Sequence, residues 1–381
     1  MFYTVFSTNN TPYMQWQSEL LEHSWKRVEQ EGVLVRLVAT DEPANMPVHK
    51  HAQCFATPSW DHDPETGDFY PILNKPASLL EWVFREQPEG TVLLLDPDCA
   101  FREPVTRRAA PGFPAAQAWI KSAKRRPSAK CPFGLGKGFA FLNDHCARTD
   151  LGTEPVMFPM LIHTSDLRMI CARWLELCRI VRREYRDPDG KPKWESDMFA
   201  YTAACAEYGL DHDPISLGIC TNWEPKDAPA APIIHYCAPV QDKNGERIFF
   251  KQTYSPWASV ESDVEPEHDH GRDLIRLIND HADAINGIVR PVAADRSPKW
   301  HNSVMEGRVI DEIMLEIPAD NERIWLNASG KAIWELCDGS RTVDEIGSEL
   351  SKRFASNGRD LTADVVSTVS QLRAAGFLNI R

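Results

Sequence analysis

Apolar and polar residues alternate over positions 2–7 and predict a buried first strand. Thr11-Pro12 follows, with an N-cap residue ahead of a proline suited to the first helical position. Apolar residues then recur at helical spacing to about residue 30, and the apolar run 33–38 predicts a second strand. A strand, a helix and a strand at this spacing predict a βαβ unit, and therefore a parallel sheet covered by helices.

The clearest later strand is the short, continuous apolar run 91–95, which is typical of a central strand buried on both faces. It ends in Asp96-Pro97-Asp98. The stretches 39–70 and 103–150 lack clear periodicity and are interpreted as loops. Further periodic segments predict helices over 74–86, 164–185 and 194–209, and a short strand over 233–236.

The pattern changes near the C-terminus. The acidic stretch 258–271 indicates a boundary, 273–288 a connecting helix, and 308–317 with 322–327 a hairpin. Three short helices follow, capped by Ser329, by the capping box of Thr342 and Glu345, and by Thr362. We therefore predict an α/β domain over 1–258, a linker over 259–295, and a small α+β, winged-helix-like domain over 296–381.

Composition excludes several classes of protein. The net charge of −13 argues against a general nucleic-acid binder but allows a local basic pocket. No run of about 18 apolar residues is present, and the N-terminus reads as a strand, so we expect neither a transmembrane helix nor a signal peptide. The ten cysteines form no Cys-x-x-Cys pair. We therefore expect a reduced, cytoplasmic protein without nucleic-acid or membrane partners.

Asp96 and Asp98 are the strongest chemical signal. The carboxyl end of a central parallel strand is where α/β sheets bind ligands. Two carboxylates there can hold Mn²⁺ or Mg²⁺, with a diphosphate supplying further oxygens. His235, at the end of a later strand, could complete the site. A plain Asp-Pro-Asp turn and a structural histidine remain the alternatives.

Other polar clusters are weaker signals. Asp197 and Glu195 lie at the start of a helix and could face a hydroxyl group, although acids in a first turn are also ordinary partners of the helix dipole. Asp-His-Asp occurs at 61–63 and 211–213, without the two-histidine helical spacing of a metal hydrolase. The glycine-rich stretch 134–138 lacks the features of a phosphate-binding loop and is interpreted as a turn.

Five segments in order resemble the plant and algal peptidyl hydroxyproline arabinosyltransferases and peptidyl serine galactosyltransferases. They begin with Thr-Asn-Asn-Thr-Pro-Tyr-Met-Gln-Trp-Gln, and they cover 8–17, 70–82, 93–98, 197–201 and 234–236. The resemblance covers about residues 3–257 and implies a GT-A, Rossmann-like glycosyltransferase that uses a UDP-sugar and an Asp-x-Asp metal pair. The middle region, 103–150, departs most from the family.

The same resemblance implies roles for matching positions. Asp96, Asp98 and His235 would bind the metal, and Asp96 would also contact the donor. The carboxylate of Asp197, with Glu195 close by, would face the donor sugar or the acceptor. The remaining donor-binding positions would be Thr8, Asn9, Asn74 and Lys251, the last of these neutralising diphosphate charge.

A second resemblance covers about residues 297–381. The segments 325–329, 333–346 and 372–378 look like the PqqD family of recognition elements for ribosomally made, post-translationally modified peptides. The resemblance implies that a leader peptide adds as a strand beside the last sheet strand and the third helix. The docking edge would be formed by Arg323, Ile324, Trp325, Leu326 and Asn327.

Together the two halves predict a metal-dependent UDP-sugar:peptide glycosyltransferase, by resemblance a retaining one, that modifies a side-chain hydroxyl of a precursor peptide. Its leader would be held by the C-terminal domain. One alternative is a non-catalytic peptide-binding adaptor with a degenerate transferase domain. A free-standing metal-dependent hydrolase is another, and it predicts turnover without any UDP-sugar.

Overall fold

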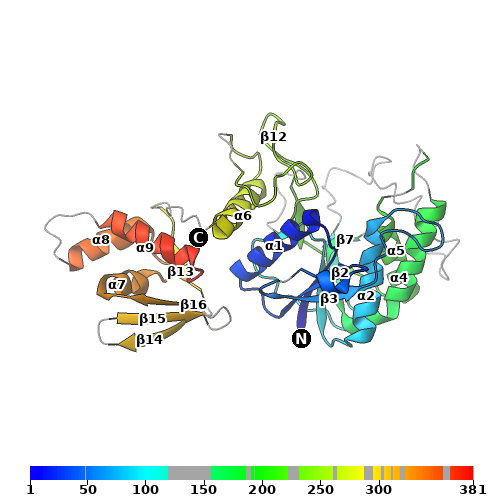
Figure 1. Ribbon diagram of the computed structural model, residues 1–381, viewed down its shortest axis with the longest axis horizontal. Coiled ribbons are helices and arrows are strands. Elements are labelled where there is room, and N and C mark those ends of the chain that lie inside the picture. Colours follow the sequence, from blue (N-terminus) through cyan, green and yellow to red (C-terminus); the bar gives the residue numbers. More distant parts are fainter. Residues whose placement is uncertain are drawn as a thin grey trace. The chain divides into compact units, whose positions relative to one another are not determined.

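The computed structural model divides the chain into two compact units, Met1–Leu277 and Ile278–Arg381 (Figure 1). The division falls inside helix α6 (Asp269–Asn286), whereas the limits predicted from sequence lie at 258 and 295 and remain a prediction. Among the described residues, no helix has the length and apolar character needed to cross a membrane. The structure describes all residues except 48, 119–155, 186–189, 193, 222–230, 261–263, 287–294, 302–303, 310–311, 318–321, 355–360 and 381.

A seven-stranded sheet organises the first unit, in the order β3-β2-β1-β4-β7-β6-β8. Strands β3, β2, β1 and β4 run parallel, β7 is antiparallel to β4 and β6, and β8 is parallel to β6. The predicted βαβ unit and central strand are thus confirmed. The strands are β1 (Phe2–Asn9), β2 (Val33–Ala39), β3 (Ala52–Thr57), β4 (Thr91–Leu95), β6 (Ala115–Ala118), β7 (Val156–His163) and β8 (Asp213–Ile215).

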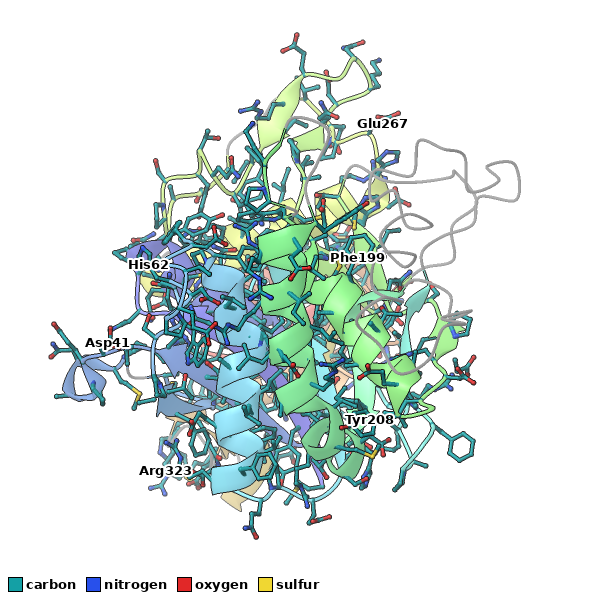
Figure 2. All side chains as sticks on the ribbon, turned by 90° about the vertical axis from the view of Figure 1, so that its right-hand side faces the viewer. Asp41, His62, Phe199, Tyr208, Glu267 and Arg323 are labelled. Carbon is teal, nitrogen blue, oxygen red and sulfur yellow. The ribbon has the colours of Figure 1, made fainter. Side chains whose placement is uncertain are left out.

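Helices cover both faces of this sheet. On one face α2 (Asn74–Arg85), α4 (Thr164–Glu184) and α5 (Ser196–Glu207) share a core with Val92 and Leu94 (Figure 2). On the other, Leu21 of α1 (Pro12–Arg27) joins Leu93 and Leu95. Because side chains alternate along a strand, β4 is buried on both sides, as its continuous apolar pattern predicts.

A smaller sheet lies beyond the end of β4. It has the order β5-β10-β9, built from β5 (Cys99–Phe101), β10 (Ile233–His235) and β9 (Gly218–Cys220). β10 is antiparallel to β5 and parallel to β9, so His235 is directly opposite Cys99 on one side and Cys220 on the other. The remaining short elements of this unit are η1 (Pro43–Asn45), η2 (Pro71–Leu73), β11 (Val240–Gln241) and β12 (Arg247–Phe249).

The second unit packs helices on a three-stranded antiparallel sheet, β14-β15-β16. Its core includes Leu315, Trp334, Ile346 and Val369. The predicted α+β module is confirmed, and so is its capping box, in which Thr342 and Glu345 exchange hydrogen bonds. Its elements are β13 (Pro298–Trp300), β14 (Met305–Val309), β15 (Glu312–Ile317), β16 (Glu322–Leu326), α7 (Ala328–Leu336), α8 (Val343–Arg353), α9 (Thr362–Ala374) and β17 (Leu378–Ile380).

Several local predictions are wrong. The strand predicted over 308–317 is two strands, since residues 308 and 309 belong to β14. Asn327, rather than Ser329, caps α7, because its side-chain Oδ1 accepts from the Gly330 amide at 3.0 Å. Helix α9 has Leu361 at its N-cap, and Thr362 is its first helical residue.

Two strands lie in stretches interpreted as loops. Strand β3 lies within 39–70, and β6 lies in the first part of 103–150. The glycine-rich stretch 134–138 lies outside the described residues.

Candidate functional site

The Asp96-Pro97-Asp98 turn joins central strand β4 to β5 at the carboxyl end of the parallel strands. Asp98 is buried, and Asp96 is partly exposed. The backbone carbonyl of Asp98 accepts a hydrogen bond from the Tyr236 amide at 2.9 Å. Strand pairing therefore brings the end of β10 beside this turn.

His235 completes a set of three donors. Its Nε2 lies 3.3 Å from Oδ1 of Asp98 and 3.7 Å from Oδ2 of Asp96. The ligand atoms of all three residues lie within 4.8 Å of one another. Carboxylate oxygens and one imidazole suit Mn²⁺ and also accommodate Mg²⁺, so the donors present fit the ion expected from the sequence.

Two ammonium groups accompany these carboxylates. Lys251 contacts Oδ2 of Asp98 through its Nζ. The Nζ of Lys75 lies 2.6 Å from Asp96 and 2.7 Å from Asp197, and it sits over the Phe158 ring. Lys75 is buried, so it links two carboxylates that come from distant parts of the chain.

The same contacts control the charge of the site. Burial would raise the pKa of the Asp98 carboxyl, but His235 and Lys251 beside it hold that pKa well below its usual range. Burial would lower the pKa of His235, yet the neighbouring Asp98 charge raises it to about 10. The carboxylate of Asp98 is therefore ionised at neutral pH and surrounded by positive charge.

The structure brings Asp197 to this cluster through Lys75. The side chain of Asp197 is buried in the first turn of α5, and its backbone carbonyl accepts from Nε1 of Trp174 at 2.8 Å. Burial raises the pKa of Asp197, and Lys75 opposes that rise. Glu195 lies two residues earlier, half-buried at the N-cap of α5, where its carbonyl accepts from the amides of Met198 and Phe199.

The predicted donor-binding residues lie at strand and helix ends nearby in the fold. Thr8 and Asn9 end β1, and Asn9 Oδ1 accepts from the Thr11 hydroxyl at 2.8 Å. Asn74, at the start of α2, donates to Asp61 and accepts from the Trp60 amide, at 2.6 Å each. In this structure its amide group therefore positions the loop at 60–61.

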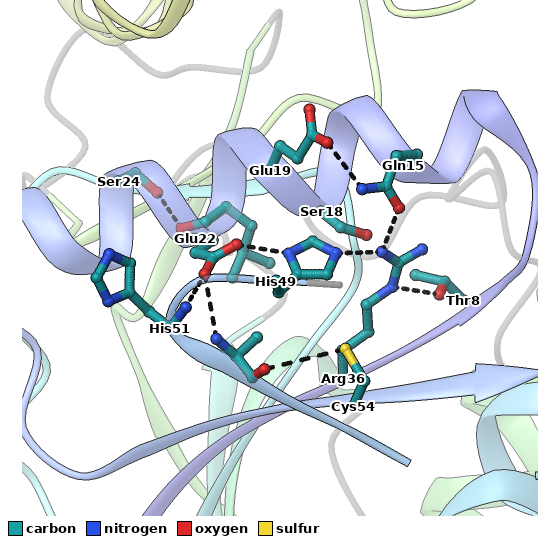
Figure 3. Close-up of polar contacts among 12 residues, drawn as sticks. Thr8, Gln15, Ser18, Glu19, Glu22, Ser24, Arg36, His49, His51 and Cys54 are labelled. Atoms are coloured by element: carbon teal, nitrogen blue, oxygen red, sulfur yellow. Dashed lines mark hydrogen bonds and ion pairs between the residues drawn. The ribbon is translucent and has the colours of Figure 1, made fainter. Parts of the chain in front are cut away.

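A buried polar network holds Thr8 in place (Figure 3). Nε of Arg36 donates to the Thr8 hydroxyl at 2.9 Å, and Nη1 donates to Gln15 at 2.6 Å. His49 lies between Nη1 of Arg36 and Glu22, at 2.5 Å from each. Burial lowers the pKa of Arg36 to about 10. The network ties β1, β2 and α1 together behind the carboxyl ends of the strands.

Two thiols also lie close to His235. Cys220, His235 and Cys237 offer ligand atoms within 4.8 Å of one another. A hydrogen bond from Cys220 lowers the pKa of Cys237 to about 6. Neither cysteine is in a disulfide; Cys220 is buried and Cys237 is exposed.

In the second unit, β16 pairs with β15 alone among the described strands and is an edge of its sheet. Ile324 and Leu326 face the core, whereas Arg323 and Trp325 point outward, Trp325 being 58% exposed. Asn327 follows the strand and caps α7. The residues predicted to dock a peptide thus form an edge with available main-chain groups and an exposed indole.

Sequence reasoning missed Lys75 and the pair Cys220 and Cys237. Lys75 directly follows Asn74, a predicted donor-binding residue, at the start of an expected helix. This position next to a candidate site residue is the signal that could have identified it. The cysteines lie 17 positions apart in sequence, without a spacing typical of a metal site. Only the pairing of β9 with β10 brings them together.

Comparisons with known families match both halves. The Hydroxyproline O-arabinosyltransferase family N-terminal domain matches residues 2–214, more than half of the chain. Coenzyme PQQ synthesis protein D (PqqD) matches residues 313–378.

Curated relatives resemble the first unit. Peptidyl serine alpha-galactosyltransferase of Arabidopsis thaliana is 28% identical over 253 residues, 62% of this chain and 30% of that protein. The protein of that name from Chlamydomonas reinhardtii is 24% identical over 267 residues, 61% of this chain and 34% of its own length. Hydroxyproline O-arabinosyltransferase 3 of Arabidopsis thaliana is 22% identical, covering 55% of this chain and 57% of that protein. The chain thus spans about a third of the length of the two galactosyltransferases.

Two solved structures are similar to parts of the chain. Galactosyltransferase LgtC, in complex with donor and acceptor sugar analogs, covers 72% of this chain and 95% of its own, at 11% identity and a TM-score of 0.42. TbiB1, in complex with the TbiA(beta) leader peptide, covers 21% of this chain and 93% of its own, at 20% identity and a TM-score of 0.19.

The matched segments agree with the architecture, since the first family model ends within β8 and the second runs from β15 to β17. The chain therefore belongs to the hydroxyproline O-arabinosyltransferase family through its N-terminal domain, and it carries a PqqD domain near its C-terminus.

Proposed function

We propose that this protein is a glycosyltransferase that moves a sugar from a UDP-sugar to a side-chain hydroxyl of a ribosomally made precursor peptide. The observation that carries the proposal is the convergence of Asp96, Asp98 and His235 at the carboxyl end of β4. The relatives named as peptidyl serine galactosyltransferases support the choice of a peptide hydroxyl as acceptor. The PqqD domain supports a peptide as the bound partner.

Asp96, Asp98 and His235 would hold Mn²⁺ or Mg²⁺. When bound, that ion supplies positive charge against the diphosphate that leaves with the nucleotide. Thr8, Asn9 and Asn74 would bind the donor at the ends of β1 and α2.

The two lysines have different tasks in this proposal. Lys251, which contacts Asp98 in this structure, would bind the diphosphate of the donor once a cation takes its place beside Asp98. Lys75 keeps Asp197 oriented beside Asp96, with Nζ–O distances of 2.7 and 2.6 Å. Asp197 would then face the donor sugar or the acceptor hydroxyl, with Glu195 as its neighbour. We assign retention of anomeric configuration. The names of the relatives specify an α linkage in the product, and an α-linked donor that gives an α-linked product has kept its configuration.

The PqqD domain would bind the leader by strand addition to β16. Free main-chain groups of an edge strand provide affinity, and outward side chains such as Arg323 and Trp325 provide selectivity. Holding the leader raises the acceptor concentration at the transferase domain, to about the millimolar range for a short flexible connection. A transferase site of low intrinsic affinity could therefore act on varied core sequences.

The first test is calorimetric titration of UDP, and then of a panel of UDP-sugars, into the protein with and without Mn²⁺. Manganese-dependent binding that is abolished by Asp98→Ala and kept by Asp344→Asn, a change at an exposed carboxylate of α8, would support the proposal. Absence of nucleotide binding both with and without Mn²⁺ would overturn it. A protein that then still bound a precursor leader would be a peptide-binding adaptor.

A further inference from the structure

His235 lies close to two kinds of donor, carboxylates and thiols. The Asp96 and Asp98 carboxylates lie near Nε2, whereas Nδ1 is buried and has no hydrogen-bond partner among the described residues. Buried polar atoms are nearly always satisfied, so an orphaned imidazole nitrogen requires a reason. The sulfur atoms of Cys220 and Cys237 lie within 4.8 Å of a ring nitrogen of His235 and of each other.

We propose that Cys220, Cys237 and His235 form a second cation site, which binds a thiophilic divalent ion such as Zn²⁺. Thiolate and imidazole are the ligands that Zn²⁺ selects, whereas Mn²⁺ and Mg²⁺ prefer carboxylates. Tetrahedral Zn–S bonds place donors about 3.8 Å apart, so donor separations of at most 4.8 Å require a contraction of no more than about 1 Å. Three protein ligands leave one position open, and Cys237 is an exposed residue, so the site lies at the protein surface.

The backbone holds the two thiols in this arrangement. Cys220 is the direct strand partner of His235 in the parallel pair β9–β10, and Cys237 follows His235 by two residues. One residue beyond each cysteine, the Thr221 hydroxyl donates to the Ala238 carbonyl. His270 contacts the Thr221 carbonyl from α6 at 3.1 Å. The two ligand-bearing segments are therefore fastened to each other without any ion.

The second site is coupled to the carboxylate site because they share one imidazole. Two divalent ions that share one imidazole would lie close together and repel each other strongly. Zn²⁺ at the thiols should therefore weaken Mn²⁺ binding at Asp96 and Asp98. This consequence rests on the proposed function, whereas the thiol site itself does not.

The test is titration of the whole 381-residue chain with Co²⁺ in the presence of a phosphine reductant. Binding is monitored through the thiolate-to-cobalt charge-transfer absorption. We expect a charge-transfer band that disappears when Zn²⁺ displaces Co²⁺. The affinity for Co²⁺ should fall by more than about tenfold in Cys220→Ser and in Cys237→Ser. Cys54→Ser, a half-buried cysteine on β3, is the matched control, and Asp98→Asn should keep the band. In the wild type, Zn²⁺ should also slow alkylation of Cys237, a measurement that needs no variant.

A band unchanged in both cysteine variants, a band lost in Asp98→Asn, or no band at all would overturn the inference. A reductant-resistant disulfide between Cys220 and Cys237 would do the same. The outcome is separable from that of the transferase proposal. Thiol-dependent cobalt binding without UDP binding would support this inference and contradict the proposed function. UDP binding without thiol-dependent cobalt binding would support the proposed function and contradict this inference.

Discussion

Lys75 shows how much one residue contributes at the candidate site. It is buried, and it contacts Asp96 and Asp197, so its ammonium offsets two carboxylates at once. Removing one partner from a buried ion pair leaves an uncompensated charge in a medium of low polarity. The site therefore depends on this lysine for its stability as well as for its geometry.

We predict that Lys75→Met, which keeps the stem but removes the charge, lowers the free energy of unfolding by about 3 kcal/mol. Urea denaturation would measure the change. Lys352→Met on the exposed surface of α8 is the matched control and should have almost no effect. Adding Asp197→Asn to Lys75→Met should recover part of the loss, and failure of that recovery would contradict the assignment.

His212 is a second residue whose charge matters. It is partly buried, and its Nε2 lies 2.9 Å from the Tyr201 hydroxyl. Burial lowers its pKa from 6.5 to about 4. A depressed histidine pKa means that the folded state prefers the neutral ring, so its stabilising effect is complete above pH 6.5 and is lost as the pH falls toward 4.

We predict that between pH 7 and pH 5 the wild type loses about 1–2 kcal/mol more unfolding free energy than His212→Gln. Denaturant titrations of both proteins at the two pH values provide the comparison. Parallel losses in the two proteins would show that His212 is not the group responsible.

At the scale of elements, the edge strand β16 is the feature with the most direct consequence. Its inward residues Ile324 and Leu326 pack on the core, while the indole of Trp325 is 58% exposed. A large aromatic side chain on an unpaired edge is suited to contact an added strand. The charge of Arg323, which pairs with Glu316 at 2.9 Å, adds a polar partner on the same outward side.

We predict that Trp325→Ala weakens binding of a precursor leader by more than about tenfold without lowering the unfolding temperature, since aromatic residues dominate such interfaces. Fluorescence anisotropy of a labelled leader would measure the affinity. Phe354→Ala, which removes an aromatic ring 54% exposed after α8, is the matched control. Equal weakening by both variants would argue against docking on β16.

At the scale of the whole molecule, the two units have separate hydrophobic cores. Trp82 and Trp174 belong to the core between the large sheet and its helices. The core of the second unit is built around Trp334, Ile346 and Val369. Because each core is complete within its own unit, each unit should unfold cooperatively by itself.

We predict two calorimetric transitions. Ile346→Ala should lower the unfolding free energy of the PqqD domain alone, by about 2–5 kcal/mol, and so shift only the transition of that domain. Ile170→Ala, its counterpart in the core of the first unit, should lower the temperature of the other transition only. Manganese-dependent UDP binding should survive Ile346→Ala. A single transition shifted by both variants would contradict this independence.

Local patterns were sufficient for much of the fold. The run 91–95 predicted a strand buried on both faces, and the residues Thr342 and Glu345 predicted a capping box, because both depend on neighbouring positions in the chain. Strand β7 was not expected, since Pro159 interrupts its apolar run. Strand β3 was missed because Ala52–Thr57 mixes small and polar residues.

The sequence by itself therefore determined the βαβ start, the carboxylate pair at the end of β4 and the family of each half. Only the tertiary structure decided that Lys75 joins Asp197, 122 positions away, and that Cys220 stands beside Cys237 at His235. Periodicity and capping record contacts within one turn or one strand, whereas strand order brings distant residues together. The charge partners of the site and its thiols follow from that order.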